Sequence, residues 1–174
     1  MEGFLEMKSV SLEPKTKAAI ATAIQQVFAD EYGDVAGTYC AVYAWVGQRV
    51  IKEALGLDYK LTAGSLSLLD SEGERFGFLV EQGNYHAWLT RAMGHRTELV
   101  DFSSIHWPWL CEQTGYEIRS SGPRFIWTFQ DELNPDWEWA DGGAFVEKFA
   151  IEGINELFAQ PLVAKVLARL STSG

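Results

Sequence analysis

The sequence predicts an α+β fold in which N-terminal helices pack on an antiparallel sheet and further helix follows the sheet. Apolar residues recur at three- and four-residue steps in the segments 14–32 and 40–55, which is the spacing of a helix with one buried face. From residue 59 the pattern changes to short strand-like runs broken by turns, and it becomes helical again after residue 145. A chain of 174 residues, 47% apolar and 22% charged, has the size and composition of one domain, 1–174.

Each of the two N-terminal helices has its own start and stop signals. Residues 14–32 begin with a proline, which the first turn of a helix tolerates, and a glycine follows them. The buried face of this helix is predicted to contain Ile20, Ala23, Ile24, Val27 and Phe28. A glycine-containing loop over 34–39 leads to the second helix, 40–55, which starts at Cys40 and stops at Gly56.

The middle of the chain predicts an antiparallel meander. Its strands are expected at 59–64 and 65–69 (one strand or two), 75–81, 85–91, 96–102 and, later, 123–129. The segment 103–122 contains Pro108 and predicts irregular structure. Residues 131–141 are acidic and contain Trp137 and Trp139, which favours a solvated loop anchored by two tryptophans. Such a loop is also suited to a cationic or peptide-like substrate.

The C-terminal part predicts a helix in two pieces. Residues 145–158 form the first piece, whose apolar face is expected to contain Phe149, Ala150, Ile154, Leu157 and Phe158. Pro161 is expected to interrupt this helix, because proline lacks a backbone N–H and clashes with the preceding turn. The second piece then runs over 162–170.

The charge balance limits the classes of partner. With 14 Lys and Arg against 24 Asp and Glu, the net charge is −10, which repels phosphate backbones and anionic membranes. We therefore expect no nucleic acid and no membrane as partners. The longest uncharged run, 35–48, is too short to span a bilayer, and residues 1–10 do not have the pattern of a signal peptide. These features predict a cytoplasmic protein whose two cysteines, Cys40 and Cys111, stay reduced.

Cys40 is the candidate nucleophile. It begins a helix, where free backbone N–H groups and the positive end of the helix dipole favour an anion such as a thiolate. His86 lies on the strand 85–91 and Asp101 near the end of the next one, and a hairpin turn centred near residues 93 and 94 places them opposite each other. Cross-strand partners of this kind, with Cβ atoms about 5 Å apart, are within hydrogen-bond reach. Together the three side chains supply a nucleophile, a proton carrier and an orienting carboxylate.

Each of these three residues also has a simpler interpretation. A lone cysteine is more often a small buried apolar residue, a lone strand histidine is more often structural, and an aspartate at a strand end commonly forms a turn. The presence of all three, with the histidine and the aspartate in cross-strand register, favours a catalytic site over three separate roles.

Four segments around these residues resemble the transglutaminase-like core of the papain-like cysteine-proteinase superfamily. They are Gly37-Thr-Tyr-Cys40-Ala-Val-Tyr-Ala44, the run 54–64, His86-Ala87-Trp88, and Val100-Asp101-Phe102-Ser103. The resemblance implies a papain-like fold, a Cys40–His86–Asp101 triad and acyl chemistry through a thioester. The family contains peptidases, amidases, protein cross-linkers, acyltransferases and members that have lost activity.

The chain also departs from the pattern of that family. Phe102 stands where a proline usually follows the aspartate, and an extra charged turn lies between Gly64 and His86. Nothing in the sequence matches the calcium-binding segments of the large animal transglutaminases. The Arg-Gly-Gly that precedes the cysteine of arylamine N-acetyltransferases is absent before Cys40.

The rest of the expected site consists of an oxyanion donor and a pocket. The backbone N–H of Cys40 needs a second donor beside it, for which Gln26 of the first helix is preferred. The other candidates are Gln25, Tyr32, Thr38 and Tyr39. The candidate pocket residues are Tyr39, Trp88, His106 and Trp107. The last two belong to an aromatic segment that can equally be a satellite apolar cluster under a loop.

These observations predict a thiol-dependent hydrolase or acyltransferase that acts on the acyl group of a peptide, a protein or a small amide, with no cofactor and no metal. Two other classes stay open. One is an inactive papain-like domain that binds a partner through its aromatic loops. The other is a metal-dependent hydrolase that uses His86, His95, His106 and Cys111, although their spacing matches no compact zinc pattern.

Overall fold

Helices and an open antiparallel sheet make up the chain, which confirms the α+β class. The computed structural model describes residues 12–173. Residues 1–10, on which the expectation of no signal peptide rests, lie outside this range.

The two N-terminal helices have the predicted bounds. Helix α1 spans Pro14–Tyr32 and α2 spans Cys40–Leu55, and each is followed by the expected glycine. All five apolar residues predicted for the inner face of α1 are buried. The bounds agree because the apolar spacing and the helix terminators point to the same residues. The connection between the helices is a 3₁₀ helix, η1 (Gly33–Thr38), where a loop was expected.

Six antiparallel strands form one sheet within the described residues. They are β1 (Lys60–Leu69), β2 (Arg75–Phe78), β3 (His86–Met93), β4 (Arg96–Asp101), β5 (Ile126–Phe129) and β6 (Trp137–Asp141). Five of them lie in the order β2-β1-β3-β4-β5, and β6 pairs with β1. The segments 59–64 and 65–69 therefore belong to one continuous strand. The strand expected over 75–81 stops early, and the 3₁₀ turn η2 (Val80–Gln82) follows it.

Strand β6 corrects the expectation of a solvated loop over 131–141. Only the first part of that segment is irregular, and it contains a 3₁₀ turn, η4 (Gln130–Glu132). Trp139 is buried in the sheet, whereas its neighbours Glu138 and Ala140 are exposed. This alternation is that of a strand with one buried face, and the acidic residues obscured it in the sequence.

At Gly64, the pairing of β1 with β3 ends and its pairing with β6 begins. It pairs with His86 at the start of β3 and with Asp141 at the end of β6. A Cβ atom on Gly64 would lie 2.0 Å from the carbonyl oxygen of Ala140, far inside van der Waals contact. Glycine therefore allows the backbone of β6 to approach β1 next to the start of β3, which is where the candidate site lies.

The segment 103–122 contains a helix where irregular structure was expected. The 3₁₀ turn η3 (Ser104–His106) leads directly into α3 (Trp107–Thr114). Pro108 lies in the first turn of α3, where its missing N–H has no helical partner to lose. The proline therefore starts this helix rather than preventing it.

The C-terminal helices are divided at a different place from the one expected. Helix α4 spans Ala144–Glu152 and α5 spans Glu156–Thr172, so the break lies at Gly153 and Pro161 lies inside α5. The side chain of Asn155 caps α5 by accepting a hydrogen bond from the backbone N–H of Leu157. The expected apolar face is also wrong in part, because Ala150 is buried whereas Phe149, Leu157 and Phe158 are exposed.

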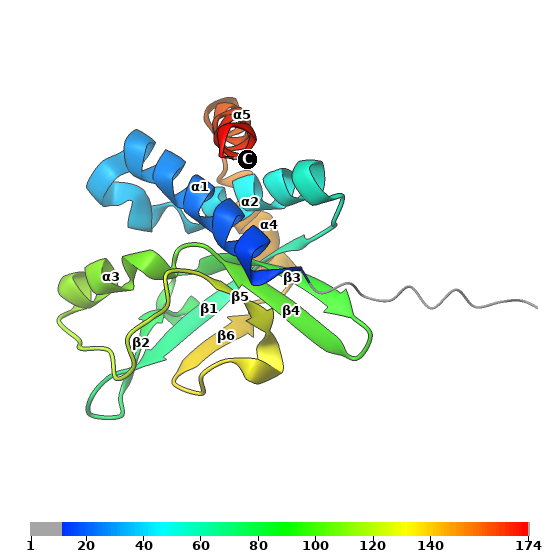
Figure 1. Ribbon diagram of the computed structural model, residues 1–174. Helices are drawn as coiled ribbons and strands as arrows, with labels where there is room; N and C mark the ends of the chain where they lie inside the picture. Colours follow the sequence, from blue (N-terminus) through cyan, green and yellow to red (C-terminus); the bar gives the residue numbers. More distant parts are fainter. Residues whose placement is uncertain (1–11, 174) are drawn as a thin grey trace, which may run out of the picture.

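Two apolar cores cover the two faces of the sheet. The first core joins α1, α2 and α5 to strand residues such as Leu89 and Val100. The second core lies on the other face and includes Trp88, Leu99, Trp107, Leu110 and Trp139. Figure 1 shows α1, α2 and α5 stacked on one side of the sheet, with α5 outermost. Because successive side chains of a strand point to opposite faces, Trp88 and Leu89 belong to different cores.

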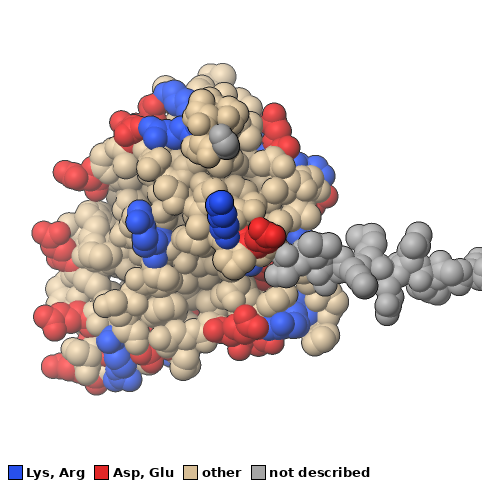
Figure 2. Space-filling view, viewed as in Figure 1, with Lys and Arg blue, Asp and Glu red and all other residues tan. Residues whose placement is uncertain are grey.

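The surface bears charges of both signs. On the face shown in Figure 2, Lys and Arg are separated by Asp, Glu and uncharged residues, and no continuous basic area forms there. Among residues 12–173, no helix combines the length and the apolar character needed to cross a bilayer.

Candidate active site

Cys40 is the first residue of α2 and lies at the wall of a pocket. Only 8% of its surface is exposed. Within the described chain no side chain caps the start of α2, so backbone N–H groups of its first turn are left without helical partners. These N–H groups and the helix dipole favour negative charge at the position of the thiol.

His86 and Asp101 form a buried hydrogen-bonded pair. His86 is the first residue of β3 and Asp101 is the last residue of β4, so both lie at the same end of the sheet. The Nε2 atom of His86 donates to Oδ2 of Asp101 over 2.6 Å. The ring of His86 stacks on that of Phe78 with centroids 5.4 Å apart, and only 1% of the histidine is exposed.

The cross-strand register expected for this pair is wrong by two residues. The turn between β3 and β4 contains only Gly94 and His95, and Met93 pairs with Arg96. Continuing this register places Trp88, not His86, opposite Asp101. A shift of two residues keeps a side chain on the same face of the sheet, and the bond therefore joins diagonal neighbours.

Asp101 accepts hydrogen bonds from several directions. Its Oδ1 atom accepts from the backbone N–H of Ser103 at 2.9 Å and from the hydroxyl of Ser103 at 2.6 Å. Its Oδ2 atom accepts from Nε1 of Trp139 at 3.0 Å as well as from His86. Burial alone would raise the pKa of Asp101, but the charge of His86 and these hydrogen bonds from His86 and Ser103 lower it.

The proton of the pair resides on His86 at neutral pH. Burial disfavours the imidazolium, but the charge and hydrogen bond of Asp101, with a smaller contribution from the Cys40 thiol, raise the pKa of His86 to about 10. The other ring nitrogen, Nδ1, is buried and has no hydrogen-bond partner among residues 12–173. Because Nε2 is engaged by Asp101, Nδ1 is the nitrogen left for the thiol.

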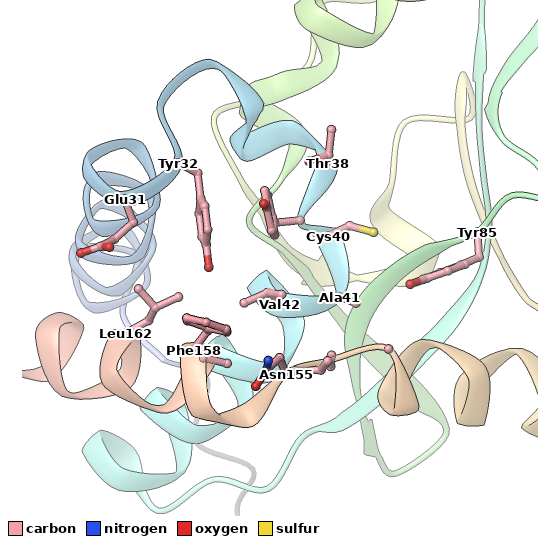
Figure 3. A pocket seen from close by; sticks show the side chains of 14 residues that line it. Glu31, Tyr32, Thr38, Cys40, Ala41, Val42, Tyr85, Asn155, Phe158 and Leu162 are labelled. Atoms are coloured by element: carbon pink, nitrogen blue, oxygen red, sulfur yellow. The ribbon is translucent and has the colours of Figure 1, made fainter.

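The pocket beside Cys40 has a volume of about 530 Å³. It lies between the end of α1, the start of α2 and the junction of α4 with α5. In Figure 3 Cys40 and Tyr85 lie on one side of the pocket, and Phe158 and Leu162 of α5 lie on the other. Tyr39 is the one expected pocket residue that lines it.

The expected glutamine donor does not reach the thiol. Gln26 is exposed on the outer face of α1, and its side chain accepts a hydrogen bond from Arg169 of α5. Gln25 is buried, but its amide nitrogen donates to the carbonyl oxygens of Phe102 and Arg124. Both glutamines are therefore structural, and the prediction of Gln26 as oxyanion donor is wrong.

Tyr85 is the residue that sequence reasoning missed at the mouth of the pocket. Its hydroxyl points into the space beside Cys40 in Figure 3. Burial and the charge of Cys40 raise the pKa of Tyr85, so the phenol stays protonated and can donate. Its position directly before His86 was the signal available in the sequence, because neighbouring residues at a strand start share one end of the sheet.

The remaining expected pocket residues do not line this pocket. Trp88 and Trp107 are fully buried in the second core. His106 accepts a hydrogen bond at Nε2 from the hydroxyl of Tyr43, which lies one turn after Cys40 on α2. A Cβ atom on Gly37 would lie 3.1 Å from that of His106, so the turn before Cys40 packs closely on the histidine. His106 therefore packs against the start of α2 and stabilises it.

The histidines and Cys111 are not gathered into one site. His95 lies in the exposed hairpin turn and Cys111 lies on α3. Within the described range, no three His, Cys, Asp or Glu side chains are grouped in a way that would hold a metal ion.

Comparison of the chain with known proteins finds no counterpart: no family model, no curated protein and no solved structure matches it. The resemblance to the transglutaminase-like core therefore depends on the motif residues alone.

Proposed function

We propose that the protein is a papain-like, transglutaminase-like thiol enzyme that forms a thioester on Cys40 and passes the acyl group to water or to an amine. The observation that carries the proposal is the buried His86–Asp101 pair, in which Nε2 of the histidine is held by the carboxylate and Nδ1 is left for the thiol. This division of the two ring nitrogens is what a cysteine nucleophile requires of its proton carrier.

In the proposed reaction, the thiol proton of Cys40 already resides on Nδ1 of His86 in the resting state, and the thiolate sulfur forms a bond to the carbonyl carbon of the substrate. The amide C–N bond then breaks, and the imidazolium gives its proton to the leaving amine. Water or a second amine attacks the thioester, its proton moves to His86, and the C–S bond breaks to restore the thiolate beside the protonated imidazole. The raised pKa of His86 supports the resting state, in which the imidazole is protonated.

Two donors are proposed for the oxyanion that forms during each attack. The first is the backbone N–H at Cys40, the first residue of α2, because the N–H groups of a first helical turn have no partner within the helix. The second is the hydroxyl of Tyr85, which lines the same pocket. Asp101, Ser103 and Trp139 act through His86, because their hydrogen bonds fix the carboxylate that orients the imidazole.

The test is capture of the acyl intermediate. The protein is incubated with 4-nitrophenyl acetate, and intact-mass and peptide mass spectrometry locate the acetyl group. We expect an acetyl group on Cys40 that hydroxylamine removes. The label is lost in Cys40→Ala and retained in Cys111→Ala. His86→Ala slows acylation by at least 10²-fold, whereas His95→Ala, which removes an exposed histidine, leaves the rate within twofold.

A second candidate function, a non-catalytic binding domain, is favoured by one observation. Cys40 and His86 are 8% and 1% exposed, which is also the burial of residues that only fill a core. In such a domain the acetyl group would be absent from Cys40, and replacement of His86 would not change the labelling of either cysteine. That result would reject the enzyme proposal in favour of the binding domain.

A further inference from the structure

The composition of the pocket wall beside Cys40 indicates which acyl groups the proposed enzyme would take. Much of the wall is aromatic and aliphatic. This part consists of Tyr32 and Tyr39, which stack with centroids 4.0 Å apart, and of Val42, Phe158, Ala159 and Leu162. Cys40 lines the same pocket as these side chains, so the substituent of an acyl group bound at the sulfur has this apolar surface within the pocket.

Among residues 12–173, the pocket wall presents no charged side chain without a partner. Glu31 is the one charged residue among those that line the pocket, and Lys165 of α5 forms an ion pair with it. The polar side chains of Thr38 and Asn155 are engaged in hydrogen bonds with the backbone of Val35 and Leu157. A charged substituent entering this pocket would lose its water and gain no opposite charge.

The acidic segment that was expected to receive a cationic substrate lies elsewhere. Part of it forms β6, and none of the residues 131–141 lines the pocket beside Cys40. The carboxylates of this segment are therefore not placed to hold a cationic substituent in the pocket beside the thiol.

The apolar surface continues from the pocket to the outside. Phe158 lines the pocket and is nevertheless 72% exposed, so the pocket opens along this ring. The ring of Phe149 on α4 meets that of Tyr85 edge to face, with centroids 5.9 Å apart, and is itself exposed. An apolar substituent longer than the pocket would therefore still lie against apolar side chains at its exit.

We infer that the pocket binds an uncharged, apolar acyl chain whose carbonyl carbon is attacked by Cys40. This inference rests on the proposed function and goes beyond it by naming the class of acyl donor. Each methylene buried by such a chain favours binding by about fourfold, from the free energy of transferring a CH₂ group out of water. A chain of eight carbons is thus expected to acylate Cys40 at least tenfold faster than an acetyl group.

The test uses a series of 4-nitrophenyl esters with acetyl, hexanoyl, octanoyl and negatively charged succinyl groups. The rate of nitrophenol release is measured for each ester, corrected for hydrolysis in buffer, and the adduct on Cys40 is located by mass spectrometry. We expect the order octanoyl, hexanoyl, acetyl, with succinyl slowest. As a measure of binding alone, octanamide is expected to protect Cys40 from iodoacetamide at concentrations at which acetamide does not.

Two variants make the assignment specific to this pocket. Phe158→Asp places a charge on the pocket wall, and we expect the octanoyl-to-acetyl ratio to fall at least fivefold. Phe145→Asp is the matched control, because Phe145 is 82% exposed on α4 and does not line the pocket; the ratio is expected to stay unchanged. Circular dichroism establishes that both variants are folded.

The outcomes separate this inference from the proposal on which it depends. If Cys40 is acylated at rates that do not depend on chain length, or fastest by the succinyl ester, the apolar assignment is wrong and the thiol chemistry stands. If no ester leaves an acyl group on Cys40, both are wrong.

Discussion

Replacing Asp101 with asparagine tests the buried pair that organises the site. Asparagine has the shape of aspartate but no charge, and it offers one acceptor oxygen instead of two. The amide oxygen can accept from His86 and Trp139, or it can accept from Ser103, but it cannot do both. In the better orientation the amide oxygen keeps His86 and Trp139, and the backbone N–H of Ser103 loses its acceptor.

The cost follows from these contacts. Removal of one partner from a buried charge pair costs about 3–5 kcal/mol. A buried donor left without an acceptor accounts for about 1–3 kcal/mol of such a loss. We therefore expect Asp101→Asn to lower the free energy of unfolding by about 3–5 kcal/mol at pH 6, which is a large fraction of the stability of a typical domain.

The loss of stability in Asp101→Asn depends on pH, and the raised pKa of His86 determines whether it grows or shrinks as the pH rises. Its pKa is about 10 in the folded protein and 6.5 in an ordinary environment. The stabilisation is fully present below pH 6.5, and it is lost as the pH rises toward 10, by about 1.4 kcal/mol per pH unit at most. The difference between wild type and Asp101→Asn should therefore shrink from pH 6.5 to pH 10.

Urea unfolding at pH 6, 7, 8 and 9, followed by circular dichroism and tryptophan fluorescence, measures this difference. Asp131→Asn is the matched control, because Asp131 pairs with Arg96 on the surface; we expect it to cost less than 1 kcal/mol. A difference between wild type and Asp101→Asn that stays constant from pH 6.5 to 9 would refute the assigned protonation of His86.

Three further substitutions test other parts of the site. Trp139→Phe removes the indole hydrogen bond to Asp101 and should lower the free energy of unfolding in urea by about 2 kcal/mol. The control is Trp137→Phe, which should cost clearly less because Nε1 of Trp137 has no partner in the described chain. Equal losses of stability in the two variants would contradict the role of the bond. Gly64→Ala drives a methyl group into the backbone of β6 and should lower stability by about 3 kcal/mol; an unchanged melting temperature would contradict the close approach. Tyr85→Phe should lower kcat for 4-nitrophenyl acetate by about 10²-fold while alkylation of Cys40 stays within twofold, and an unaltered kcat would exclude Tyr85 as a donor.

The sequence predicts best where several local signals coincide. The bounds of α1 and α2 follow from apolar spacing with a proline or a glycine at the expected ends. Cys40 could be placed at a helix start for this reason. The two-residue error in the β3–β4 register came from the position of the turn, and it kept His86 and Asp101 on one face because it was even.

The features that the sequence did not predict depend on contacts between distant residues. Trp139 lies 38 residues from the carboxylate to which it donates, and the acidic residues around it resemble a solvated loop. The break before α5 is an exception, because it coincides with a local cap at Asn155, and Pro161 is accommodated inside the helix. The sequence could not assign α5 to the pocket wall, because no local pattern indicates that Phe158 and Leu162 line the same pocket as Cys40.

The relative rate at which iodoacetamide alkylates the two cysteines tests the central claim most directly. Cys40 is the more buried of the two, so exposure alone would make Cys111 react faster. We expect the opposite at pH 7, with Cys40 at least tenfold faster in the wild type and no faster than Cys111 in His86→Ala. If Cys111 reacts first in the wild type, or if His86→Ala leaves the ratio unchanged, Cys40 and His86 do not form a nucleophilic pair.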